Sequence, residues 1–185
     1  MPRLAASAAA PRGRENRLFQ TGLARSAAIA ATQAETAPEA AEAAAFLADG
    51  SAHMALTLAE TGGFDLYRDL ICLLDSLPRP DVESLHGFSD RFGPRGDAEK
   101  FPVFSFLLSS WLHRMLRGHI DGQNIVPVFS GEDEVAARFL AGASTDALLG
   151  LWEKINDDTR QAEALNLDRK QIVLDWFSNM GDMLG

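Results

Sequence analysis

The longest regular pattern of apolar residues lies in the middle of the chain. Its large apolar side chains recur three or four positions apart, so they share one face of an α-helix. These positions are Phe104, Leu107, Leu108, Trp111, Leu112, Met115 and Leu116. The spacing predicts a central helix. Because an isolated helix of this length is marginal in water, its stability must come from packing against other helices.

Shorter stretches with the same period predict seven further helices. Five of them cover about residues 36–48, 52–60, 64–77, 81–92 and 132–141, and two longer ones follow Ser144 and Asp168. The apolar run at 125–129 allows a strand, but Pro127 restricts it to an edge strand or an extended linker. We therefore predict an all-α fold, a helical bundle preceded by a short helical hairpin.

Capping residues fix where several of these helices begin. Asp168 stands at an N-cap position with Gln171 three residues later, the pattern of a capping box. Asp81, Ser51 and Ser144 occupy corresponding positions before three other helices. The last two helices are thus expected to meet at a defined corner, because the second of them starts at a specified residue.

The chain divides into three parts by composition. Residues 1–35 are rich in Ala and Arg and show no sustained apolar stripe, so we expect a disordered leader. Two alternatives are an organellar transit peptide and sequence that is not native, as a misplaced start or a reading-frame error would give. Residues 36–61 are expected to form the helical hairpin, and residues 62–185 the helical domain.

The charge differs between these parts. The chain carries a net charge of −9. Residues 1–38 contain five arginines and two glutamates, so residues 39–185 contain twelve basic and twenty-four acidic residues. Because this acidic part, residues 39–185, repels the phosphates of a nucleic acid, we expect it to make no direct contact with nucleic acid.

Two simple features concern the membrane and the redox environment. No apolar run in the sequence is long enough to span a membrane as a helix, so we expect no membrane contact. The single cysteine, Cys72, lies in the apolar stretch 70–74 and cannot form an internal disulfide. We expect Cys72 to be a small buried side chain, because its neighbours are apolar. A single cysteine also fits a protein of a reducing compartment.

Patterns that would indicate catalysis or a cofactor are few. The sequence contains neither of the two glycine-rich motifs that bind nucleotide phosphates. His113 and His119 are six residues apart, which does not place them on one helical face for a metal. Ser109 and Ser110 near His113 lack a third, orienting group. We therefore expect no cofactor, no metal and no catalytic residue. We expect the acids at 132–134 to lie in a first helical turn, where the helix dipole favours negative charge.

The three tryptophans fall on apolar helical stripes. Trp111, Trp152 and Trp176 are expected to be core residues. Contact with a partner protein is the alternative, because tryptophan is enriched at the energetic centres of protein interfaces.

Four stretches, in order along the chain, resemble a known protein family. They are Phe46–Glu60 with its Gly-Ser pair, Leu66–Leu70, Leu151–Lys154, and Ala164–Gln171, which reads Ala-Leu-Asn-Leu-Asp-Arg-Lys-Gln. Together they are similar to the C-terminal part of the delta-prime family of bacterial DNA polymerase III subunits, over roughly residues 39–183. The first stretch resembles the end of the lid of an AAA+ module.

The resemblance implies a helical collar domain through which clamp-loader subunits assemble. The implied partners are the delta subunit and the gamma or tau-like subunits in the cytoplasm, and indirectly the sliding clamp and primed DNA. We expect Trp111, Trp152, Asn166, Arg169 and Lys170 to contact those partners. The family loads sliding clamps for the replicative DNA polymerase, without a catalytic site in this domain.

The chain also departs from the family. The AAA+ modules, their zinc-binding cysteines and their Ser-Arg-Cys motif have no counterpart here, and Met54 stands where the lid hairpin often has an arginine. The N-terminal modules are therefore expected to be missing or encoded elsewhere. An unrelated all-helical adaptor that binds a peptide is the alternative function, and an enzyme with a Ser-His or carboxylate site is a third.

Overall fold

The computed structural model describes residues 43, 46–48, 51–94, 96–97 and 99–185, and these residues form an all-α structure. The chain separates into two compact units, residues 1–59 and 60–185. The first unit contains nearly all of α3 (Ala52–Glu60), which begins where Ser51 Oγ accepts a hydrogen bond from the backbone N–H of Met54 at 3.3 Å. The predicted leader, and most of the predicted helix at 36–48, lie outside the described residues.

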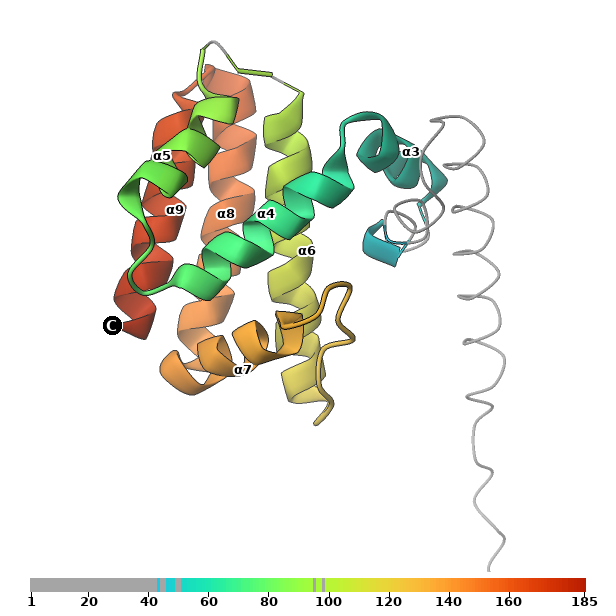
Figure 1. Ribbon diagram of the computed structural model, residues 1–185, viewed down its shortest axis with the longest axis vertical. Helices are drawn as coiled ribbons and strands as arrows, with labels where there is room; N and C mark the ends of the chain where they lie inside the picture. The colour runs from blue at the N-terminus through green and yellow to red at the C-terminus, as the bar shows by residue number, and fades with distance from the viewer. Residues whose placement is uncertain (1–42, 44–45, 49–50, 95, 98) are drawn as a thin grey trace, which may run out of the picture. The chain divides into compact units, whose positions relative to one another are not determined.

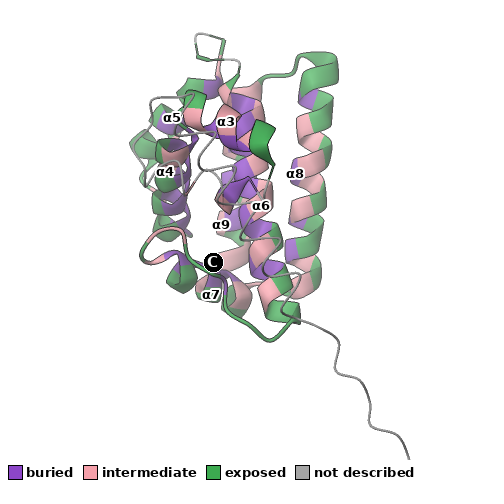
Figure 2. Ribbon diagram, turned by 90° about the vertical axis from the view of Figure 1, so that its right-hand side faces the viewer, coloured by how far each residue is buried: buried purple, intermediate pink, exposed green. Residues whose placement is uncertain are grey.

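The second unit contains the other α-helices of the described part. They are α4 (Gly63–Ser76), α5 (Val82–Ser89), α6 (Lys100–Ile120), α7 (Glu132–Gly142), α8 (Thr145–Leu165) and α9 (Arg169–Leu184), with a short 3-10 helix, η1 (Asp90–Phe92), after α5. Helices α6 and α9 lie between α4 and α5 on one side and α8 on the other (Figures 1 and 2). None of the described helices combines the length and apolar composition needed to cross a bilayer.

Aromatic side chains fill the core where α5, η1, α6 and α9 meet. Ring centroids in this cluster lie 4.8–6.3 Å apart. Burial of each phenylalanine contributes roughly 1.5–3 kcal/mol, so this cluster is a main source of stability for the second unit. The members are Phe88, Phe92, Phe101, Phe104, Trp176 and Phe177, and all are buried.

The predicted caps are confirmed. The side chains of Asp81, Ser144 and Asp168 accept hydrogen bonds from the third backbone N–H of α5, α8 and α9, at 2.8, 3.2 and 3.2 Å. Each satisfies an N–H that has no partner within its helix. These local contacts explain why the predicted starts of all three helices match the observed ones.

The structure decides one alternative and corrects one expectation. The run at 125–129, which the sequence left open as an edge strand or an extended linker, is a loop, and its backbone groups bond to side chains. The expectation of a buried Cys72 is wrong, because Cys72 is exposed. Helix α4 buries Leu70, Ile71, Leu73 and Leu74. A helical face cannot hold five successive residues, since each is turned about 100° from the last.

Candidate partner-binding surface

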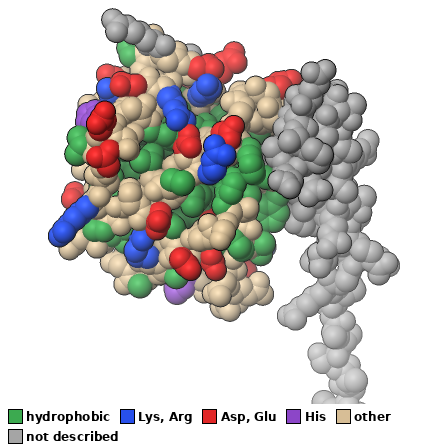
Figure 3. All heavy atoms as spheres, in the orientation of Figure 1, with side chains coloured by type: hydrophobic (Ala, Val, Ile, Leu, Met, Phe, Trp, Pro, Cys, Tyr) green, Lys and Arg blue, Asp and Glu red, His purple; other side chains and the backbone are tan. Residues whose placement is uncertain are grey.

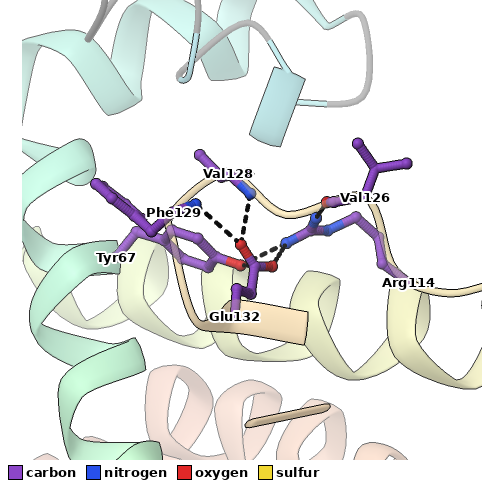
Figure 4. A network of polar contacts seen from close by, with 6 residues as sticks. All are labelled: Tyr67, Arg114, Val126, Val128, Phe129 and Glu132. Atoms are coloured by element: carbon purple, nitrogen blue, oxygen red, sulfur yellow. Dashed lines mark hydrogen bonds and ion pairs between the residues drawn. The ribbon is translucent and has the colours of Figure 1, made fainter. Parts of the chain in front are cut away.

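A buried polar cluster around Glu132 joins α4, α6 and α7. The Glu132 side chain is fully buried. Its Oε1 accepts hydrogen bonds from Tyr67 Oη at 2.6 Å and from Arg114 Nη2 at 2.7 Å, and its Oε2 accepts from the backbone N–H of Val128 at 2.6 Å (Figure 4). Phe129 N–H adds a longer bond of 3.4 Å. Glu132 lies in the first turn of α7, as predicted, but its burial was not predicted.

This cluster is structural. A buried carboxylate is tolerated only when charge and hydrogen bonds compensate its lost hydration, and here both oxygens are engaged. Burial raises the pKa of Tyr67 well above its usual value, so its hydroxyl stays protonated and donates to Glu132 even at alkaline pH. Arg114 Nη1 also donates to the carbonyl of Val126 at 3.1 Å. The cluster therefore holds the loop between α6 and α7 against the helices.

The structure does not form the serine-histidine pair that catalysis would require. Ser109 Oγ donates to Asn156 Oδ1 at 3.2 Å, across to α8. The His113 ring lies against Trp152 instead, with ring centroids 6.2 Å apart. Among the residues that the structure describes, no three His, Cys, Asp or Glu side chains are grouped to hold a metal ion.

The tryptophans have different environments. Trp111 is fully buried and makes an edge contact with Phe139 at 5.2 Å between centroids, so its side chain presents no surface to a partner. Trp176 is also fully buried, and its Nε1 donates to Asp158 Oδ2 at 2.8 Å. Both are core residues. Trp152 is half-buried and is the one tryptophan that lines an open hollow.

Asn166, Arg169 and Lys170 lie at the α8–α9 corner. Asn166 ends α8 in the left-handed conformation, with φ of 51°. The Arg169 guanidinium lies 5.6 Å from the ring centroid of Phe101, and Lys170 Nζ bonds Asp90 Oδ1 at 2.5 Å. These side chains attach the corner to α6 and η1. The corner is about 20 Å from Trp152 along α8, so the predicted partner contacts do not form one site.

The Leu151–Lys154 stretch also joins α8 to α9. Lys154 Nζ bridges Asp158 Oδ2 at 2.8 Å and Asp175 Oδ2 at 3.1 Å. The hydrogen bond with Asp158 raises the pKa of Lys154 above its usual value. Lys154 therefore contributes to the fold, whereas Glu153 is exposed and Trp152 is half-buried.

A shallow hollow lies between the end of α6 and the start of α8. It has a volume of about 220 Å³ and is lined by His113, Leu116, Arg117, Ile120, Leu149 and Trp152. Two of these apolar side chains are exposed, Ile120 at 68% and Leu149 at 38%. Neither residue was predicted from the sequence, although Leu149 beside the buried Leu148 widens the apolar stripe of α8. Exposed apolar groups around a hollow are typical of a protein-binding surface.

Comparison with protein-family models, with curated proteins and with solved structures found no match to this chain.

Proposed function

We propose that this chain is the collar part of a delta-prime-like subunit of a bacterial clamp loader, and that it supports sliding-clamp loading through contacts between subunits. The observation that carries the proposal is the apolar hollow at Trp152, Ile120 and Leu149 on a well-packed helical bundle. A helical bundle with such a surface is suited to binding other proteins. The sequence resemblance supplies the identity of the partners.

The charge of the bundle supports an indirect role at DNA. Over the coloured part of the face in Figure 3, acidic and basic side chains are interspersed with hydrophobic groups, and the described residues form no continuous basic patch there. Residues 39–185 contain twice as many acidic as basic residues. In this proposal the delta and gamma or tau-like subunits contact the clamp and the primed DNA, and this chain contacts those subunits in the cytoplasm.

A peptide-binding adaptor is the second candidate, and the hollow also favours it. The hollow has a volume of about 220 Å³. Pockets for small molecules are larger, from roughly 300 Å³ upward, so this hollow suits side chains of a bound segment. The two candidates differ in partner. A clamp-loader subunit binds particular sister subunits, whereas an adaptor binds a segment of an unrelated protein.

Size-exclusion chromatography with light scattering tests the first candidate. The full chain is mixed at low salt with purified bacterial delta and gamma or tau-like subunits. Co-elution at the mass of a complex is expected, with Ile120→Glu reducing it and Val82→Glu leaving it unchanged. Val82 is the matched control because it is also 68% exposed, on α5. Separate elution of the wild-type chain at low salt would contradict the proposal.

A further inference from the structure

We propose that the Trp152 hollow binds two turns of an amphipathic helix from a partner protein, with a large apolar side chain in the hollow and a carboxylate beside Arg117. The hollow is defined by His113, Leu116, Arg117, Ile120, Leu149 and Trp152. The occupant is defined by its chemistry, so a helix of this kind from any partner protein fits, including one from the sister subunits proposed above.

The shape of the hollow indicates a helix. Its α6 side extends from residue 113 to residue 120. At the rise of an α-helix this is about 10 Å, or two helical turns. The α8 side is formed by Leu149 and Trp152, which are three residues apart and share a face. Two neighbouring helices with apolar residues along their contact form a groove, and such a groove accepts an amphipathic helix through residues three or four positions apart.

The charge of the hollow indicates an acidic occupant. Its lining contains His113 and Arg117 and no carboxylate, although acidic residues outnumber basic ones in the body of the chain. Arg117 does contact Asp121, but this pair is 3.8 Å long and exposed. An exposed pair of this kind is weak because water screens it, so the guanidinium is available to a second carboxylate.

The indole of Trp152 also lacks an acceptor. Its Nε1–H is shielded from solvent and has no hydrogen-bond partner. An unpaired buried donor is unfavourable, so an acceptor on the occupant that reached this N–H would stabilise the complex. Trp111 Nε1 is unpaired as well, but Trp111 is fully buried and no occupant can reach it.

Selection from a phage-displayed library of random helical peptides, each four turns or more in length, tests this inference without clamp-loader subunits. The full wild-type chain is immobilised as bait. We expect enriched peptides to carry two large apolar residues three or four positions apart and an Asp or Glu on the same face. Their affinity for Ile120→Glu should fall about tenfold or more, as for a residue at the centre of an interface, whereas Val82→Glu should bind normally.

A charge exchange tests the acidic contact. Arg117→Glu should weaken the enriched peptide several-fold, and replacing the peptide's acid by Lys should restore binding to that variant. Arg160→Glu is the matched control, because Arg160 is exposed to a similar extent and also contacts an acid of its own helix. Circular dichroism and thermal melting establish that each variant folds.

Three results of the peptide experiments would overturn the inference. They are no enrichment of any helical peptide, enriched peptides that lack acids, and binding that is indifferent to both Ile120→Glu and Arg117→Glu. Concentration-dependent dimerisation of the wild-type chain that Ile120→Glu abolishes would also overturn it, since the occupant would then be a second copy. Failure of the chain to bind clamp-loader subunits affects only the proposed function.

Discussion

Glu132 shows how one buried carboxylate organises several elements of the second unit. Its two oxygens accept hydrogen bonds from α4, α6 and the loop before α7. The Arg114 guanidinium compensates the charge, and 19% of that side chain is exposed, so the pair is not wholly removed from water. Such clusters stabilise a structure only when every member is satisfied, which makes the loss of one member costly.

Glu132→Gln should lower the free energy of unfolding by about 1–3 kcal/mol, because the amide cannot balance Arg114 and cannot accept all of these bonds. Urea denaturation followed by circular dichroism measures the change. Glu134→Gln is the control, since Glu134 is an exposed residue of the same helical turn. A surface substitution of this kind should change stability by less than about 0.5 kcal/mol. Equal stability of the two variants would show that the Glu132 cluster contributes little.

Tyr67 makes the second unit sensitive to alkaline pH. A pKa raised in the folded state means that the folded protein retains a proton which the unfolded chain loses, so stability falls as pH rises above the usual tyrosine pKa of about 10. Tyr67 is the only tyrosine in the sequence. Phenolate absorbance should therefore appear together with the loss of helical circular dichroism, and Tyr67→Phe should lessen the alkaline loss of stability. Phenolate formation near pH 10 in a fully helical protein would contradict this.

At the scale of the helix, the caps determine where each element starts. Ser144 and Asp168 bound the two helices that form the corner of the second unit. Each cap satisfies one backbone N–H and fixes the direction in which the chain enters its helix. The corner is then attached to α6 and η1 by Arg169 and Lys170.

Ser144→Ala removes the acceptor of the Ala147 N–H. Loss of such a cap should destabilise the protein by about 0.5–2 kcal/mol. Thermal or urea unfolding measures the effect. Ser178→Ala provides the comparison, since Ser178 is an exposed residue inside α9 and alanine has the higher helix propensity there. The cap would be unimportant if both substitutions gave the same change.

The elements that were predicted well depend on local sequence. The period of α6 and the caps at Asp81, Ser144 and Asp168 involve residues within a few positions of each other, so the sequence alone contains them. The Glu132 cluster joins Tyr67 to a residue 65 positions away, and only the packing of α4 against α7 brings them together. The predicted burial of Cys72 is wrong for a related reason. Its neighbours in the sequence are apolar, but the turn of α4 places its side chain at the surface.

The candidate surface was predictable only in part. Trp152 was named from its residue type and the resemblance, but the same reasoning selected Trp111, which is fully buried. The two residues differ in how α6 and α8 pack, and no local pattern reports that packing. Ile120 and Leu149 join Trp152 because the antiparallel course of the helices brings the end of α6 beside the start of α8 (Figure 1).

At the scale of the whole molecule, the second unit is a well-filled bundle whose outer surface includes apolar side chains. Its core accounts for stability through packing of α5, α6 and α9, and the hollow at Trp152 lies outside that core. Exposed apolar groups gain free energy when a partner covers them. We therefore expect the biological role of the chain to depend on an assembly with other proteins.

Competition in a clamp-loading assay tests the proposed role most directly. The full chain is added in excess while an intact bacterial clamp loader is assembled from its subunits, and loading of the sliding clamp on primed DNA is then measured. We predict that the wild-type chain and Val82→Glu inhibit loading by occupying the place of the delta-prime subunit, and that Ile120→Glu does so far less. Full loading activity in the presence of a large excess of the wild-type chain would contradict the proposal.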